Sequence, residues 1–214
     1  MSINYTYRMY GRSKGRGKNN KITNHAVSIK VKKIDTLRYN IIDIGPGYGE
    51  STLSISNTHR SAQIIACEKF IDGVNKIAEK SFQHSLNNIS IFHGNVHQLL
   101  DEYCPHNSIS EIWILFPDPW PKKRHFKRRL INKNFLTLLD QISDQQTDII
   151  ISTDNVDYQN QILYLFYLDK NFIPSTEIFG KKLFNYFGLK ETKYYQKAKK
   201  CKNKSYFFLF NKRN

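Results

Sequence analysis

Short apolar runs alternate with longer mixed segments along this chain, and this alternation restricts its possible folds more than any other feature. The pattern is typical of a mostly parallel sheet that is covered by helices on both faces. The predicted strands span Tyr39–Ile44, Gln63–Glu68, Asn88–His93, Glu111–Phe116 and Asp148–Thr153. The predicted helices span Glu50–Asn57, Ile71–His84, Val96–Tyr103, Ile131–Ile142 and Val156–Lys170.

Two further strands are predicted toward the C-terminus, over Phe172–Phe179 and Ser205–Phe210, where they close one edge of the sheet. The α/β fold then has seven strands, mostly parallel, with an antiparallel strand near the C-terminal edge. A chain of 214 residues with 40% hydrophobic residues can bury one sizeable core. We therefore predict a single domain over residues 35–214, preceded over residues 1–34 by a basic segment that is mobile rather than packed.

The cysteines and the apolar runs bear on where the protein works. Cys67, Cys104 and Cys201 lie far apart and lack the paired spacing of a zinc site or a disulfide framework, which favours a reducing cytoplasm. The seven histidines show no ligand spacing, so no metal is expected. No apolar stretch approaches the roughly 20 residues that cross a bilayer, and the N-terminus lacks the apolar region of a signal peptide. We expect a cytoplasmic protein without a membrane partner.

Positive charge is concentrated at both ends of the chain, within a formal net charge of +15. The first acidic residue is Asp35, and nine lysines and arginines precede it. From Lys181 to Asn214 the lone acid is Glu191, set against eleven cations. A solvated basic surface could produce one such run. Three basic segments around a nearly neutral middle indicate a polyanionic partner, and nucleic acid is the first candidate.

The first predicted strand ends in a glycine-rich turn that leads into a helix. Gly45, Gly47 and Gly49 alternate there, and glycine lets the backbone adopt positive φ and pass close to a ligand. Tight turns between a strand and a helix also use glycine for structural reasons alone. Glu68 ends the second strand about 20 residues further on, where a carboxylate can accept hydrogen bonds from both hydroxyls of a ribose. Such an arrangement serves NAD and S-adenosylmethionine alike.

Two more polar residues follow the same strand ends. Asn95 comes after the third strand, where its amide can pair with an adenine edge or can cap the helix that begins at Val96. Asp43 stands just before the glycines and is either a turn residue or a partner for the ammonium and sulfonium of a bound S-adenosylmethionine.

The segment that follows the fourth strand is the most informative in the chain. It runs Phe116-Pro117-Asp118-Pro119-Trp120-Pro121, and its prolines stiffen the backbone around the Asp118 carboxylate. Trp120 either packs in the core or faces a substrate. Six of the eight residues from Lys122 to Arg129 are cations, which can grip phosphates.

This segment, Phe-Pro-Asp-Pro-Trp-Pro-Lys-Lys-Arg-His followed by Lys-Arg-Arg, resembles the signature of bacterial tRNA (guanine-N7)-methyltransferases. The similarity covers roughly residues 8–212, including Tyr10-Gly11-Arg12 and Thr153-Asp154. The resemblance implies a Rossmann-like class I methyltransferase that uses S-adenosylmethionine to methylate N7 of the variable-loop guanine, position 46 of tRNA. Whether the chain acts as a monomer or a homodimer stays open.

The resemblance also implies which residues form the sites. Cofactor contacts match Asp43, Glu68, Asn95 and Asp118, beside the glycines of the turn, Gly45, Gly47 and Gly49. Substrate contacts match Lys122, Asp154, Thr192, Lys193, Tyr194 and Tyr195. Three of these positions depart from the family's pattern, because the family has Glu at Asp43, Asp at Asn95 and Glu at Tyr195.

The chemistry of guanine N7 suits a site without a general base or a metal. N7 carries a lone pair and no proton, so methyl transfer needs in-line positioning above all. As the methyl arrives, positive charge develops on the purine, and a carboxylate that accepts from its N1 and N2 hydrogens stabilises the transition state. Asp118 is the candidate for this catalytic role, with Asp154 assisting.

Three other functions share parts of these patterns. An enzyme that methylates an exocyclic amine can also carry an acid followed by proline after its fourth strand, although Trp120-Pro121-Lys122 argues against it. An NAD-dependent oxidoreductase would use the same glycine turn and Glu68, but it would not need the basic segments. A tRNA-binding subunit without activity would not need Asp43, Glu68 and Asp118 together.

Overall fold

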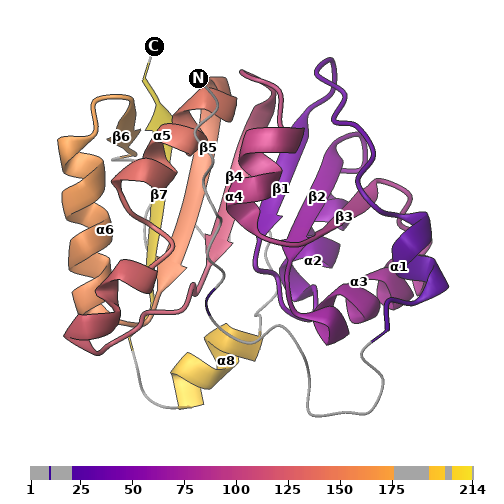
Figure 1. Ribbon diagram of the computed structural model, residues 1–214, viewed down its shortest axis with the longest axis horizontal. Helices are drawn as coiled ribbons and strands as arrows, with labels where there is room; N and C mark the ends of the chain where they lie inside the picture. The colour runs from indigo at the N-terminus through magenta and orange to yellow at the C-terminus, as the bar shows by residue number, and fades with distance from the viewer. Residues whose placement is uncertain (1–9, 11–20, 176–192, 201–203, 214) are drawn as a thin grey trace.

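The computed structural model describes Tyr10 and residues 21–175, 193–200 and 204–213, which form a seven-stranded sheet with helices on both faces (Figure 1). The strand order is β3-β2-β1-β4-β5-β7-β6. Strands β1 to β5 are parallel, and β7 runs antiparallel to both β5 and β6. The strands are β1 Asn40–Ile44, β2 Gln63–Glu68, β3 Ile89–His93, β4 Ile109–Leu115, β5 Ser143–Thr153, β6 Phe172–Pro174 and β7 Tyr206–Lys212.

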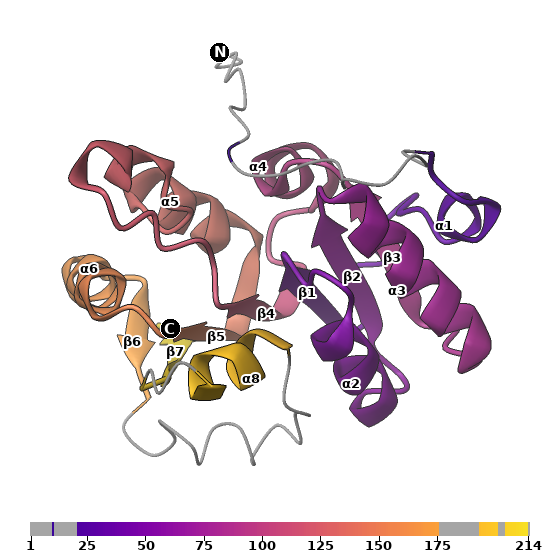
Figure 2. The same cartoon turned by 90° about the horizontal axis from the view of Figure 1, so that it is seen from below.

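The helices divide between the two faces of the sheet, as the view from below makes clear (Figure 2). One face is covered by α4, α5 and α6, and the other by α1, α2, α3 and α8. Their bounds are α1 Asn24–Ser28, α2 Glu50–Thr58, α3 Ile71–Gln83, α4 Val96–Gln98, α5 Lys133–Ile142, α6 Val156–Leu168 and α8 Lys193–Lys200. A π-helical turn, Leu99–Tyr103, continues α4, and a 3-10 helix spans Lys123–Arg128.

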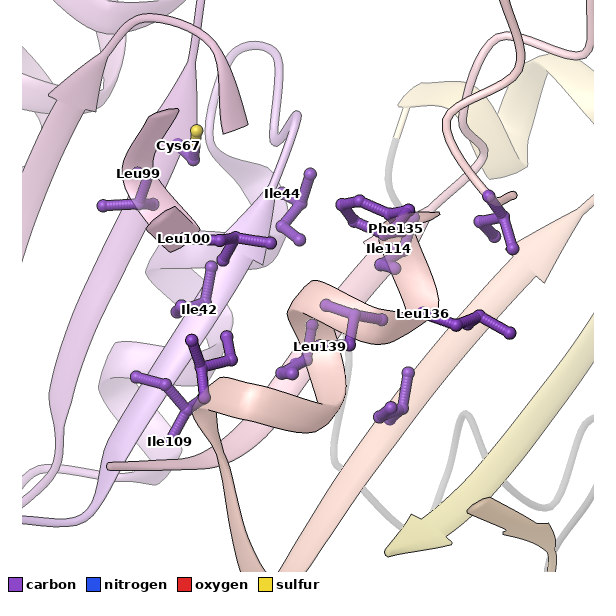
Figure 3. Close-up of a cluster of buried hydrophobic side chains, with 14 of the residues drawn as sticks. Ile42, Ile44, Cys67, Leu99, Leu100, Ile109, Ile114, Phe135, Leu136 and Leu139 are labelled. Carbon is purple, nitrogen blue, oxygen red and sulfur yellow. The ribbon is translucent and has the colours of Figure 1, made fainter. Parts of the chain in front are cut away.

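Alternation along each strand supplies both cores, because successive side chains of a strand point to opposite faces. In β1, Ile42 joins the cluster under α5, whereas Ile41 joins the cluster under α3. Figure 3 shows the first cluster, in which Phe135, Leu136 and Leu139 of α5 pack over the strands. Both faces of the central strands are therefore buried, and the sheet is a rigid support for the loops at its ends.

The predicted elements are confirmed, with boundaries that differ by a few residues. The fifth helix begins at Lys133 rather than Ile131 because Asn132 caps it, accepting a hydrogen bond from the Phe135 backbone N–H at 3.1 Å. The fifth strand starts earlier than expected, at Ser143. The described part of the sixth strand ends at Pro174, and residues 176–179 of its predicted range lie outside the described residues.

The N-terminal boundary predicted at residue 34 is wrong for residues 21–34, which pack against the domain. Val31 and Ile34 are buried, and Ile29 and Val31 exchange backbone hydrogen bonds with Ile91 of β3. The reason is that β3 lies at the edge of the sheet, where unpaired backbone groups accept a further strand-like partner. Within the described ranges, none of the helices is long and apolar enough to cross a membrane.

Candidate active site

The strand order places the candidate site at the carboxyl ends of the parallel strands. From β1 the chain builds outward through β2 and β3 on one side, and through β4 and β5 on the other. Ligands of open α/β sheets bind at such a reversal of direction. Asp43, Glu68, Asn95, Asp118 and Asp154 all lie in or directly after the carboxyl ends of these five strands.

The glycine turn between β1 and α2 needs its glycines for two separate reasons. Gly45, Gly47 and Gly49 have φ of 70°, 60° and 81°, a region that side chains disfavour. A Cβ on Gly49 would also lie 2.5 Å from Cγ1 of Ile77 on α3, so the third glycine permits close helix packing. Another glycine, Gly73 on α3, was not anticipated from the sequence. A Cβ there would lie 2.4 Å from the Gly47 carbonyl oxygen.

The Asp43 carboxylate is buried at the start of this turn and is only partly satisfied. Its Oδ2 accepts hydrogen bonds from Ser51 Oγ at 2.6 Å and Thr52 Oγ1 at 2.7 Å. Its Oδ1 is buried and has no hydrogen-bond partner among the described residues. Burial raises the pKa of Asp43 to about 6, although the two hydroxyls lower it. A buried carboxylate oxygen without a donor fits a cationic ligand group such as an ammonium.

Glu68 ends β2, and its carboxylate binds both the glycine turn and the segment that follows β2. Its Oε2 accepts from the Gly47 N–H at 2.8 Å, and its Oε1 accepts from the N–H groups of Lys69 and Phe70, also at 2.8 Å. Burial raises its pKa, and the three backbone donors and the Lys69 charge lower it. Each carboxylate oxygen can accept more than one hydrogen bond, so this geometry is compatible with ribose hydroxyls as additional donors.

Asn95 takes the structural role that the sequence left open for it. Its side-chain oxygen accepts from the His97 backbone N–H at 3.0 Å, which makes it the N-cap of α4. The side-chain oxygen also lies 3.1 Å from Nδ1 of His97. The contact expected between Asn95 and an adenine edge stays a prediction, for which the amide nitrogen of Asn95 can serve as a donor.

The Asp118 loop leaves β4 in an unusual conformation. Phe116 and Trp120 both have positive φ, at 51° and 42°, although neither is glycine. Asp118 lies between them and is exposed. Such backbone strain gathers at functional sites, where the surrounding structure must hold it in place. The exposed carboxylate is thus presented from a rigid loop, which suits a group that must meet a flat base.

The basic run after this loop does not act as one phosphate clamp, contrary to the sequence interpretation. Arg129 is 3% exposed and is therefore out of reach of phosphates. The Arg128 guanidinium lies 5.1 Å from the centre of the Trp120 ring and 5.3 Å from that of Tyr10. The cations of this run that remain exposed are Lys122, Lys123, Arg124 and Lys127. Alternate burial and exposure within a run of charges cannot be read from composition.

Apart from Tyr195, the remaining predicted substrate residues divide into three groups. Asp154 directly follows β5 and is partly exposed, so it lies at the same end of the sheet as Asp118. Lys193 and Tyr194 open α8, which lies at that end as well (Figure 1). Thr192 falls outside the described residues.

Tyr195 is placed differently from the expectation that it faces the substrate. It is 7% exposed, and its ring packs against Phe116 at 6.3 Å and Phe207 at 5.6 Å between centroids. The position carries an aromatic ring that extends the core under the Asp118 loop. Contacts with Phe116 and Phe207 hold this ring in the core, and a contact between Tyr195 and the substrate stays a prediction.

Comparison with known proteins agrees with this geometry. Residues 38–208 match the family model described as "Putative methyltransferase". A tRNA (guanine-N(7)-)-methyltransferase of Neorickettsia sennetsu is 31% identical over 158 residues, which cover 72% of each chain. One of Leptospira interrogans is 35% identical over 133 residues, which cover 62% of this chain and 61% of the relative. A SAM dependent methyltransferase from Aquifex aeolicus has a similar fold, with a TM-score of 0.52 at 13% identity over 87% of this chain and 85% of that chain.

Strand order and glycine turn together define the fold of the class I methyltransferases. Within that class, the chain belongs to the family of the tRNA (guanine-N(7)-)-methyltransferases. The alignment spans less than two thirds of the Leptospira relative's length. In the described parts of the chain, no three His, Cys, Asp or Glu residues are grouped as a metal site would require.

Proposed function

We propose that this chain transfers a methyl group from S-adenosylmethionine to N7 of guanine in tRNA, at the variable-loop guanine, position 46. The observation that carries the proposal is the exposed Asp118 on its strained loop, at the same end of the sheet as the buried Asp43 and Glu68. The names of the relatives support guanine N7 as the target and tRNA as the substrate.

The cofactor is held by groups that match its charges and hydroxyls. The free Oδ1 of Asp43 takes the ammonium of the methionine moiety, and Glu68 takes the ribose hydroxyls while it holds the Gly47 N–H. Asn95 would contact the adenine through its amide nitrogen. When bound, the cofactor supplies an electrophilic methyl group on its sulfonium. The protein's part is to hold that methyl in line with the acceptor nitrogen.

The guanine is held by carboxylates rather than deprotonated by a base. Asp118 accepts hydrogen bonds from N1 and N2 of the guanine, and Asp154 assists from the end of β5. Both interactions strengthen as positive charge develops on the purine, so they favour the transition state over the bound substrate. N7 needs no proton removed, which is consistent with the absence of a histidine from this proposed set.

Binding of the tRNA as a whole rests on lysines and arginines that reach the surface. Lys122, Lys123 and Arg124 directly follow the Asp118 loop, and Lys127 lies one turn further along the 3-10 helix. Their contacts with phosphates orient the tRNA without reading its sequence. Lys193 and Tyr194 at the start of α8, with Thr192 before them, complete the proposed substrate contacts.

Incubation of the full chain with labelled S-adenosylmethionine and an unmodified tRNA tests this proposal. Nucleoside analysis of the product should give 7-methylguanosine, and a tRNA with adenine at position 46 should give none. Label at another atom of guanine would reject N7 as the target. Label in the adenine-46 tRNA would reject the position, and label in neither tRNA would reject the activity.

A further inference from the structure

The Asp118 loop has a strained backbone and few N–H groups with which to hold it. Positive φ at Phe116 and Trp120 flanks it on both sides, and Pro117 and Pro119 have no N–H to donate. Its shape must therefore come from partners outside the loop.

One end of the loop is tied to β5 and to the core. The Phe116 N–H donates to the Ser152 carbonyl at 3.0 Å and to Ser152 Oγ at 3.2 Å. The Phe116 ring packs against Tyr195 and Phe207. The other end of the loop, at Pro119, is held by a separate partner.

That partner is Arg129, the last cation of the basic run. Its Nε donates to the Pro119 carbonyl at 2.8 Å. Its Nη1 donates to Gln161 Oε1 at 2.6 Å and its Nη2 to Asp157 Oδ2 at 2.5 Å, both on α6. The guanidinium lies over the Phe126 ring at 3.7 Å and the Tyr158 ring at 4.9 Å. Every nitrogen of the fork therefore has a hydrogen-bond partner, and two aromatic rings pack against the guanidinium.

The second proposed carboxylate, Asp154, lies just before the helix that carries two partners of Arg129. Asp154 follows β5, and Asn155 caps α6 by accepting from the Tyr158 N–H at 2.8 Å. Asp157 and Gln161, the partners of Arg129, therefore stand within two turns of Asp154 on a capped helix. Arg129 thus joins the loop after β4 to the helix after β5.

We infer that Arg129 is a positioning residue, which sets the Asp118 carboxylate relative to Asp154 and thereby to the guanine. The inference rests on the proposed function. A planar fork with donors in three directions is needed here, because the Pro119 carbonyl, Gln161 and Asp157 lie around one guanidinium. A lysine keeps the charge but cannot reach all three groups.

The test combines Arg129→Lys with Asp118→Asn under single-turnover conditions at saturating tRNA. We expect Arg129→Lys to lower the rate at least about tenfold, since a displacement of about 1 Å can cost about 100-fold. In the Asp118→Asn background, Arg129→Lys should then have little further effect, because its role acts through that carboxylate. Asn160→Ala, an exposed change on the same helix, should leave both rates unchanged. Additive losses, or an unchanged rate in Arg129→Lys, would overturn the inference.

Asp157→Asn covers the case in which Arg129→Lys does not fold, because the Asp157 side chain is 62% exposed and tolerates replacement. Asp157→Asn weakens one of the three hydrogen bonds of Arg129. We therefore expect a smaller loss of the single-turnover rate, which is again not additive with the loss in Asp118→Asn. If Asp157→Asn and Asp118→Asn lower the single-turnover rate additively, the inference is overturned as well.

A second measurement does not depend on the reaction. The chain has two tryptophans, and Trp113 is fully buried, so quenching of fluorescence by acrylamide reports on Trp120. Arg129→Lys or Asp157→Asn should raise this quenching, and Asn160→Ala should not. Unchanged quenching would show that Arg129 does not hold the loop. If the wild type methylates no tRNA, the proposed function fails, and this measurement still decides whether Arg129 orders the loop.

Discussion

Gly73 on α3 lies so close to the carbonyl oxygen of Gly47 that a Cβ on Gly73 would meet this oxygen at 2.4 Å. The contact joins α3 to the glycine turn, in which the Gly47 N–H is held by Glu68 at 2.8 Å. The glycine turn is therefore held on one side by the Glu68 carboxylate. On its other side it packs directly against the backbone of α3, because Gly73 has no side chain.

Gly73→Ala should displace this turn and weaken binding of S-adenosylmethionine. Overpacking of one methyl against a fixed backbone costs about 1–3 kcal/mol, so we expect the Kd to rise about tenfold or more. Calorimetry on the folded variant measures this. Gln83→Ala, an exposed change at the end of the same helix, is the control. An unchanged Kd would show that the turn moves without cost.

The raised pKa of Asp43 predicts opposite effects of pH on stability and on cofactor binding. Its ordinary value is 3.8 and folding raises it to about 6, so the native state takes up a proton between these values. The contribution of Asp43 to the free energy of unfolding should therefore fall as the pH rises through about 6. Cofactor binding should instead weaken as the pH falls through about 6, because the ammonium then loses its charged partner.

Thermal unfolding between about pH 4 and about pH 7 measures the first effect, and calorimetry between about pH 5 and about pH 8 measures the second. Asp43→Asn should remove the contribution of this group from both profiles, and it should bind the cofactor weakly throughout. A variant that retains the full pH dependence of cofactor binding would assign that dependence to another group, of which Glu68 is the nearest candidate.

Exposed cations after the Asp118 loop should dominate the salt dependence of tRNA binding. Each phosphate contact releases condensed counterions, so raising salt from low to physiological levels should weaken binding at least about tenfold. Replacing Lys123 and Lys127 by Gln should weaken binding and make the salt dependence shallower. Lys170→Gln, an exposed change just beyond the C-terminal end of α6, should change neither. An affinity that is flat across this range would argue against a polyanionic partner.

Asp118→Asn keeps the shape of the side chain and removes its charge. We expect a loss of about 100-fold or more in single-turnover methylation, the scale found when one oriented electrostatic partner of a transition state is removed. The affinity for tRNA should change little, because phosphate contacts supply most of it. Cofactor affinity is measured separately to isolate the step. A variant with nearly the wild-type rate would transfer the proposed role to Asp154.

The sequence by itself determined the strands, the glycine turn and the family. Each of these is encoded locally, since the period of apolar residues, the glycines at 45, 47 and 49, and the run around Asp118 can be read within a few neighbouring residues. It also placed Asp43 and Glu68 at the ends of the correct strands, because parallel strands present their carboxyl ends at one edge.

Only the tertiary structure decided which cations of the basic run are exposed and which hold other parts of the protein in place. Arg129 belongs to a basic run by sequence, yet its partners Asp157 and Gln161 lie 28 and 32 residues away and bury it. Residues 29–34 pack because β3 is an edge strand, and Gly73 matters because α3 crosses the turn after β1. Contacts between distant segments depend on how the sheet orders its strands. The local sequence pattern does not predict that order, because the residues before and after a given residue are the same for any order of the strands.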